Sequence, residues 1–471
     1  SVPGGHPTGT YGYGPMQRGS RSLQLGGGMA GMLVIADDSR VTPSALVYTP
    51  EVHLVIQQLR FGGAVSDSGW DGRWRGMAFI KDFVQDKLGP YNMTANATDS
   101  GPALTSPLLV NGQVMPVMTM VTGEVRRFRI LNACSSATLE LSLRCSDPAA
   151  GDDCHAGCST YLLAQDAVYP NATSPSPVLS YRTGASLLLF PAARVDLLVQ
   201  CSKTGSFALY SQPDTGNDGL LGAAKGPDNS DRVSQQLMSL TVQQGPGGVS
   251  CYSSAGTSGC VQTDVTAMPP QPSSLMEDLR TEPLARPVKI SLATPKTDVV
   301  ERVRVDNSAA TTVATSVPVL TVDGGDGPVT YRGDSPVNNQ TLQGPDPADT
   351  CLVSGKVYEM TVVGDGKAAY TFHLQGHQFQ IVSITSASGA SLRPQDVGLW
   401  RDVYGVGSAD TVVVIRFRAR SQLGRLLFMS SIASDFDHGM AAKIDIQTSC
   451  SGCQSPSPCW KLISGPWNRA G

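Results

Sequence analysis

Two short segments near the C-terminal end of the chain carry the side chains best suited to chemistry. One holds His373 and His377, and the other holds Asp435, Asp437 and His438. Imidazole and carboxylate groups bind divalent metals, so His373 and His438 form one candidate metal site together with these carboxylates. The simpler interpretation gives both histidines packing roles and makes the acidic segment a solvated loop.

Cysteines form a second set of candidate ligands, and the chain has eleven of them. Cys450 and Cys453 have Cys-x-x-Cys spacing, and Cys154 and Cys158 have Cys-x-x-x-Cys spacing, so a four-cysteine zinc site is one hypothesis. Disulfides are the favoured alternative, because the chain also carries glycosylation sequences and those belong to the same oxidising compartment. Since eleven is odd, at least one cysteine stays a thiol or pairs outside the chain.

Short strands must position these residues. Apolar and polar residues alternate around Phe128, Phe379 and Ile415, which is the period of half-buried β-strands. Glycine and proline number 50 and 32, and only 16% of residues are charged. This composition favours many strands joined by turns over long helices. The sequence therefore predicts an all-β protein built from sandwiches.

A chain of 471 residues is long enough for two or three such domains. Residues 245–285 are rich in Gly, Pro, Ser and Thr, and they predict a linker or insertion between two sandwiches. We expect the two main domains to span residues 39–244 and 286–448. Residues 449–471 form a tail rich in Cys, Ser and Pro.

Charge and motifs exclude several classes of function. The net charge of −4 is spread along the chain without a basic stripe, which argues against nucleic-acid binding. No apolar run approaches the ~20 residues of a membrane helix. No hydrolase elbow or phosphate loop occurs in the sequence. Because the sequence starts at Ser1 without a signal-like segment, we expect a mature product whose targeting segment has been removed.

The histidine segment resembles a family motif. Tyr370 to Phe379 is similar to the His-Pro-x-His-Leu-His-Gly-His-x-Phe motif in the third domain of multicopper oxidases, such as laccases, ascorbate oxidases and ferroxidases. Phe428 to Met440 is similar to their His-Cys-His-Ile…Gly-Met block, in the same order and spacing. Arg401-Asp402 between them resembles a further family signature.

Upstream segments extend the resemblance over most of the chain. Gly9 to Met16 and Gly31 to Ile35 resemble the end of the family's first domain. Three further segments resemble strand signatures of the family's second domain: Leu109–Gly112, Arg127–Ala133 and Pro191–Leu197. The resemblance implies tandem cupredoxin-like Greek-key sandwiches. Residues 1–38 would then be the C-terminal remnant of an incomplete first domain.

The resemblance also locates the family's copper ligands. A blue copper centre needs two imidazoles and a thiolate with a weak axial ligand. The matching positions hold Tyr370, Ser430 and Asp435, and only the axial Met440 is kept. Of the trinuclear cluster, His373 alone is preserved, and the other matching positions hold Gly14, Met16, Gln375, Met429 and Ser431. We therefore predict no bound copper and no other cofactor.

These losses predict a non-catalytic member of the family and not an enzyme. The predicted function is that of a secreted glycoprotein with a structural or interaction role at a cell wall, an extracellular matrix, or a cell or flagellar surface. Two alternatives stay open. One is a copper-dependent oxidoreductase, laccase-like or ferroxidase-like, with an atypical centre. The other is a subunit of an extracellular filament.

The expected location is extracellular. Acceptor sequences for N-glycosylation occur at Asn92, Asn96, Asn171 and Asn339. The expected partners are other extracellular proteins or glycans. An incomplete sandwich exposes sheet edges. Two alternatives stay open: a separate chain is a further partner that completes the first domain, or the sequence lacks the N-terminal part of that domain. The leftover cysteine suggests a disulfide to a partner.

Overall fold

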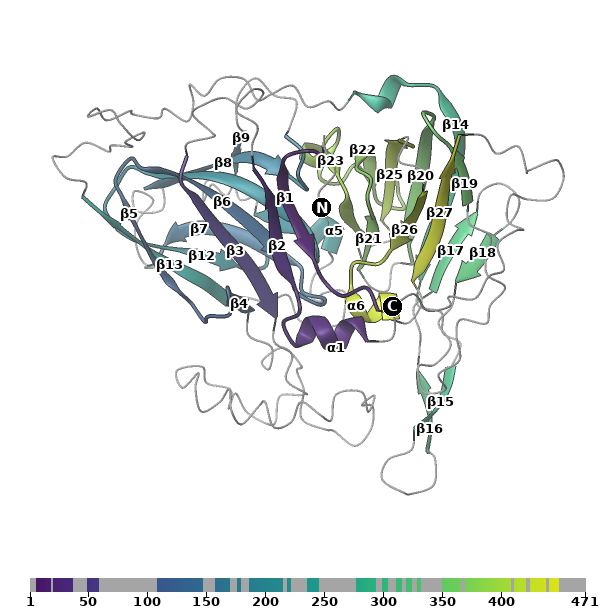
Figure 1. Cartoon of the computed structure of the whole chain (residues 1–471), viewed down its shortest axis with the longest axis horizontal. Helices are drawn as coiled ribbons and strands as arrows, with labels where there is room; N and C mark the ends of the chain where they lie inside the picture. Colours follow the sequence, from purple (N-terminus) through teal and green to yellow (C-terminus); the bar gives the residue numbers. More distant parts are fainter. Residues whose placement is uncertain are drawn as a thin grey trace. The chain divides into compact units, whose positions relative to one another are not determined.

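The computed structural model has an all-β fold of two compact units (Figure 1). Unit 1 comprises Ser1–Met16 with Ser22–Glu277, and unit 2 comprises Gln17–Arg21 with Asp278–Gly471. The predicted fold class is confirmed. The structure describes residues 6–17, 20–36, 49–58, 108–146, 157–169, 176–178, 186–214, 218–221, 235–244, 277–293, 299–303, 311–315, 319–323, 328–331, 350–365, 369–407, 411–420, 424–437 and 440–448.

Unit 1 contains two sheets and a two-stranded antiparallel ribbon. The strand order is β4-β3-β6-β11-β8-β9 in the six-stranded sheet and β10-β7-β12-β13-β5 in the five-stranded sheet. The bounds are β1 Gly9–Tyr13, β2 Gly31–Ile35, β3 Glu51–Gln58, β4 Leu108–Val110, β5 Val117–Val121, β6 Val125–Asn132, β7 Leu139–Cys145, β8 Cys158–Gln165, β9 Ser176–Val178, β10 Leu187–Leu189, β11 Arg194–Cys201, β12 Gly205–Ser211 and β13 Gln235–Gln243, with short helices α1 Arg21–Gly26 and α5 Asp218–Leu221.

A buried ionic network crosses the six-stranded sheet of unit 1. Arg127 and Arg129 on β6 both donate to Asp196 on β11, at 2.6 Å and 2.9 Å. Thr10 on β1 donates to the same carboxylate at 2.6 Å, and Glu51 on β3 accepts from Arg129. Strand β6 is therefore buried on both faces, although its alternation predicts a half-buried strand. Burial of the two arginines is tolerated because carboxylates compensate their charges and accept their hydrogen bonds.

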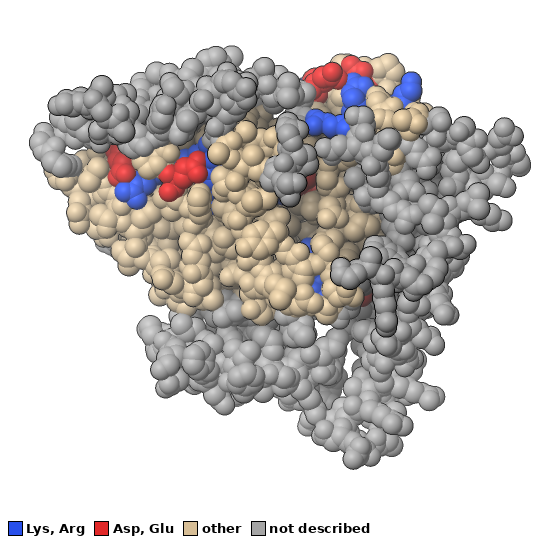
Figure 2. Space-filling view, in the orientation of Figure 1, with Lys and Arg blue, Asp and Glu red and all other residues tan. Residues whose placement is uncertain are grey.

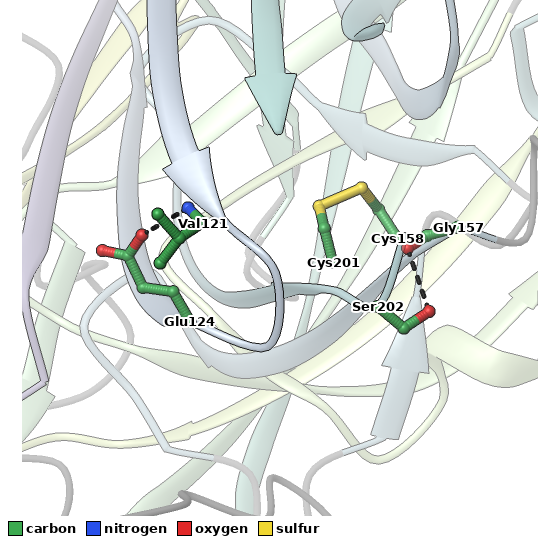
Figure 3. The surroundings of a disulfide bond; sticks show 6 residues. All are labelled: Val121, Glu124, Gly157, Cys158, Cys201 and Ser202. Atoms are coloured by element: carbon green, nitrogen blue, oxygen red, sulfur yellow. Dashed lines mark hydrogen bonds between the residues drawn. A yellow bond between two sulfur atoms is a disulfide. The ribbon is translucent and has the colours of Figure 1, made fainter. Parts of the chain in front are cut away.

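A disulfide joins neighbouring strands of the same sheet. Cys158 at the start of β8 bonds to Cys201 at the end of β11, 43 residues later, and Ser202 beside it donates to the Gly157 carbonyl (Figure 3). Cys145 is disulfide-bonded as well. The buried Cys134 keeps a thiol that donates to a backbone carbonyl at 3.7 Å.

The disulfide excludes one cysteine pair of the zinc hypothesis. A Cys154–Cys158 zinc pair is wrong, because the sulfur of Cys158 is already bonded to Cys201. Cys450 and Cys453 lie outside the described residues.

Unit 2 contains two larger sheets and a separate hairpin. The seven-stranded sheet has the order β18-β17-β14-β20-β25-β22-β23, the five-stranded sheet has the order β19-β27-β26-β21-β24, and β15 pairs with β16. The bounds are β14 Leu284–Ala293, β15 Val299–Val303, β16 Thr311–Thr315, β17 Val319–Asp323, β18 Pro328–Tyr331, β19 Thr350–Val353, β20 Val357–Gly364, β21 Tyr370–Leu374, β22 Phe379–Thr385, β23 Trp400–Arg401, β24 Val403–Val406, β25 Val412–Arg418, β26 Gly424–Met429 and β27 Ala441–Gln447, with η7 Leu279–Thr281, η9 Pro394–Asp396 and α6 Ala433–Asp437.

The core of unit 2 follows the predicted alternation in one strand and departs from it in another. On β25, Ile415 and Phe417 are buried and the residues between them are partly exposed, as predicted. On β22, Gln380 is buried between two apolar neighbours. Its side chain accepts the backbone N–H of Leu279 at 2.8 Å and donates to the Gly398 carbonyl at 3.0 Å. A polar side chain satisfied in this way is stable in a core.

The surface of the described residues is mostly uncharged on the face in Figure 2, where acidic and basic side chains occur together in small groups. No helix in the described part of the chain is long and apolar enough to cross a membrane. The change of unit at Glu277 to Asp278 lies inside the predicted linker, 245–285. The finer predicted domain limits stay predictions, as does the interpretation of residues 1–38 as a remnant.

Candidate functional site

The two segments that resemble the copper motif lie side by side in unit 2. Strand β21 begins at Tyr370 and pairs with β26 through His373 and Met429. On its other edge, β21 pairs with β24, where Tyr370 lies opposite Val406. The sheet therefore brings together positions that are far apart in the sequence.

Three of the four predicted blue-copper positions meet just after β26. The backbone N–H of Ser430 donates to the carbonyl of Met440, and the N–H of Met440 donates to the carbonyl of Asp435, both at 2.9 Å. The Ser430 hydroxyl donates to the Asp435 carboxylate at 3.2 Å. These hydrogen bonds place Asp435, on the short helix α6, and Met440 beside Ser430. Tyr370, the fourth position, is buried in β21.

Hydroxyl groups occupy the interior of this region. Thr371 Oγ1 accepts hydrogen bonds from Ser431 Oγ at 2.7 Å and from the N–H of Ile432 at 3.2 Å. It also lies 3.5 Å from Ser430 Oγ, which accepts from the same N–H at 3.2 Å. We call Thr371, Ser430, Ser431 and Asp435 the hydroxyl cluster. Sequence analysis missed Thr371, because the family motif has an apolar residue at that position.

A buried arginine from the distant N-terminal segment closes the same region. The backbone N–H of Arg21 donates to Asp437 Oδ1 at 3.1 Å, and its Nη1 donates to the Ser430 carbonyl at 3.4 Å. The guanidinium lies over the ring of Phe436, 5.1 Å from its centroid. Burial lowers the pKa of Arg21 to about 10, and the nearby Asp437 opposes this shift. The side chain therefore stays a cation at neutral pH. No sequence signal identifies a contact across 409 residues.

The residues of this region do not fit a blue copper centre. Such a centre takes a thiolate and two imidazoles, whereas Ser430, Asp435 and Tyr370 offer a hydroxyl, a carboxylate and a phenol. The Ser430 hydroxyl is already engaged with Asp435 and with the N–H of Ile432. The thioether of Met440 is the single matching ligand, and it is fully buried.

The predicted trinuclear positions divide between the two units. Gly14 and Met16 belong to unit 1, where both are exposed. In unit 2, Gln375 and His373 are half-buried. Met429 and Ser431 are buried in unit 2. Within the described residues, no three His, Cys, Asp or Glu side chains lie close enough together to hold a metal.

Of the two remaining histidines in the motif segments, the structure describes only His377. His377 is buried, its Nε2 accepts the N–H of Arg420 at 3.2 Å, and its ring lies edge-on to Phe417. Burial is the main cause that lowers the pKa of His377 to about 4, so the ring is neutral at physiological pH. His438 lies outside the described residues, as do the four glycosylation candidates Asn92, Asn96, Asn171 and Asn339. The proposed metal site of His373 and His438 stays a prediction.

Comparisons with known proteins agree on one family. Residues 314–449 match the family model described as multicopper oxidase. No curated protein matches the sequence. McoA multicopper oxidase from the hyperthermophile Aquifex aeolicus is similar in structure over 93% of this chain and 76% of its own, with 19% identity and a TM-score of 0.57.

Two other solved structures give the same result. A multicopper oxidase from Campylobacter jejuni, titled a metallo-oxidase, is similar over 93% of this chain and 72% of its own, with 16% identity and a TM-score of 0.55. A multicopper oxidase from Pseudomonas thermotolerans is similar over 94% of this chain and 77% of its own, with 15% identity and a TM-score of 0.53. At these identities the structural likeness shows the fold.

Two predictions from the sequence are corrected by these findings. The prediction that the protein is not an enzyme is wrong, because the matched family and the similar structures are oxidases. The prediction of no cofactor is wrong for the same reason, because multicopper oxidases use copper. Both predictions concluded, from the loss of individual copper ligands, that the whole protein lacks copper and activity. Residues 314–449 thus match the multicopper oxidase family model, and the chain has the fold of the multicopper oxidase structures to which it is similar.

Proposed function

We propose that the protein is a copper-dependent oxidoreductase with an atypical centre. The observation that carries this proposal is the family match over residues 314–449, which includes both β21 and β26. The cupredoxin fold of the chain supports it. Copper, when bound, supplies one-electron transfer to the reaction.

The atypical character follows from the chemistry of the hydroxyl cluster. Ser430 and Asp435 give oxygen donors where a blue centre needs sulfur and nitrogen. The centre therefore uses other residues than these blue-copper positions. His373, which the resemblance assigns to the trinuclear cluster, is half-buried on β21 and is the one histidine kept from that set.

We place the protein outside the cell, with other extracellular proteins or glycans as its partners. The disulfide between Cys158 and Cys201 supports this location, because disulfides persist in oxidising compartments. Glycans at the predicted acceptor sites belong to the same proposal. Mass spectrometry of protein secreted from a eukaryotic host, before and after deglycosylation, tests it. An unchanged mass would remove the glycoprotein part of the proposal.

Metal content and oxygen consumption test the oxidoreductase proposal. The full chain is purified after secretion, stripped with a chelator and reconstituted with copper, and its copper is measured by mass spectrometry. Oxygen uptake is then followed with a phenol and with Fe(II). The second substrate is included because the Campylobacter jejuni structure is titled a metallo-oxidase.

We expect stoichiometric copper, together with oxygen uptake that chelation abolishes and copper restores. Stripped protein without added copper is the control. Protein that retains no copper after reconstitution and consumes no oxygen with either substrate would refute the proposal.

A further inference from the structure

A fixed positive charge lies beside the region that the resemblance assigns to blue copper. The Arg21 side chain is 6% exposed, and its Nη1 lies 3.4 Å from the Ser430 carbonyl oxygen. The side chain packs on Phe436 of α6. Arg21 Nε has no hydrogen-bond partner within the described part of the chain. The guanidinium is therefore held in place by packing, by Ser430 and by the nearby Asp437 carboxylate.

The groups around this cation engage one another. Asp437 accepts the backbone N–H of Arg21, and Asp435 accepts the Ser430 hydroxyl. Thr371 on β21 joins the same region through the Ser431 hydroxyl. The two carboxylates and the three hydroxyls thus each have a hydrogen-bond partner within the protein. The charges are those of one arginine and two carboxylates.

We propose that Arg21 is the internal cation of this region, and that Arg21 and the hydroxyl cluster form a structural tie where the resemblance places blue copper. The tie links Arg21, β21, β26 and α6, and it does not bind copper.

The engagement of the Ser430 hydroxyl and its ligand chemistry support this inference. The hydroxyl already donates to Asp435 and accepts the N–H of Ile432. A serine hydroxyl is also a poor substitute for a thiolate, which is the soft ligand that selects copper in these sites. The inference goes beyond the proposed function, since copper bound elsewhere in the chain leaves this region unchanged.

Copper binding to full-length protein tests the negative half of the inference. The copper bound at saturation is measured in the unmodified protein and in a variant with Ser430→Ala and Asp435→Ala, which removes both oxygen donors. We expect the same amount in both, whether that amount is zero or stoichiometric. Loss of one copper equivalent in the variant would overturn the inference. The proposed function fails separately, if the unmodified protein binds no copper and consumes no oxygen.

Thermal unfolding tests the structural half. Arg21→Gln removes the charge, and we expect it to lower the unfolding midpoint by about 5 °C or more. Arg280→Gln is the matched control, because that side chain is 45% exposed and pairs with an exposed aspartate of the same unit. Arg21→Lys, which keeps the charge, should recover part of the loss.

A midpoint for Arg21→Gln equal to that of Arg280→Gln would overturn the inference. If Arg21→Gln cannot be purified folded, Thr371→Val gives the answer, since it deletes only the hydroxyl that accepts from Ser431 and Ile432. We expect that variant to lower the midpoint too, and an unchanged midpoint would refute the tie.

Discussion

Substitution of Asp196 by asparagine tests the ionic network inside unit 1. The carboxylate is 2% exposed and accepts from Arg127 Nη2 at 2.6 Å, Arg129 Nη1 at 2.9 Å and Thr10 Oγ1 at 2.6 Å. The asparagine side chain has nearly the same size but no charge. It leaves two buried guanidinium groups with Glu51 as their remaining carboxylate partner in the described residues.

The expected cost is large because the arginines remain buried. Removing one partner of a buried ion pair typically costs about 3–5 kcal/mol, since the other charge loses its compensation. Two arginines depend on Asp196, but Glu51 is partly exposed and still reaches both of them. We therefore expect Asp196→Asn to lower the unfolding free energy of unit 1 by about 3–5 kcal/mol.

Denaturant unfolding gives the measurement. The two compact units are expected to unfold in separate steps, so fluorescence and circular dichroism are fitted to a three-state model. Glu124→Gln is the matched control, because Glu124 pairs with Arg126 of β6 and both side chains are more exposed than those of the Asp196 network. Glu124 also accepts the Val121 N–H (Figure 3). Ion pairs that solvent reaches contribute less than buried ones, at most about 1 kcal/mol when fully exposed. If Asp196→Asn costs no more than Glu124→Gln, the reasoning about burial is refuted.

Three further predictions concern single groups. Tyr404→Phe removes the hydroxyl that donates to the buried Asp396 at 2.6 Å, and it should cost about 1–3 kcal/mol in the unfolding free energy, whereas an unchanged denaturation midpoint would contradict this. Because burial holds the pKa of His377 at about 4, below its unfolded value of about 6.5, the unfolded state binds more protons between these values. Stability should therefore fall as pH falls from 6.5 to 4, and the fall should be shallower in His377→Gln; parallel pH profiles would refute the assignment. Replacing Cys158 and Cys201 by Ala should cost about 2–4 kcal/mol, measured by denaturation against the unmodified, oxidised protein. Equal stabilities would show that this bond contributes little.

Part of the fold is readable from local patterns. The alternation at β25 predicts which residues are buried, because period-2 spacing sends neighbouring side chains to opposite faces. The same rule fails on β6, where Arg127 and Arg129 are buried by Asp196 of another strand. It also fails for Gln380, which is satisfied by backbone groups distant in the sequence. Local patterns cannot report such partners.

For the copper region, the sequence by itself determined the residue types: Tyr370, Ser430 and Asp435 stand where imidazoles and a thiolate would be needed. That conclusion needs only chemistry, since a side chain cannot supply an atom it lacks. The sequence did not determine which side chains pack and hydrogen-bond in this region. The prediction that the whole chain is not an enzyme, which was drawn from the loss of these ligands, was wrong.

Only the tertiary structure decided what stands there instead. Pairing of β21 with β26 brings Thr371 to Ser431, and the fold brings Arg21 across 409 residues to Ser430. The physical reason is that hydrogen bonds and charge compensation depend on distance in space, which strand pairing sets and residue order does not.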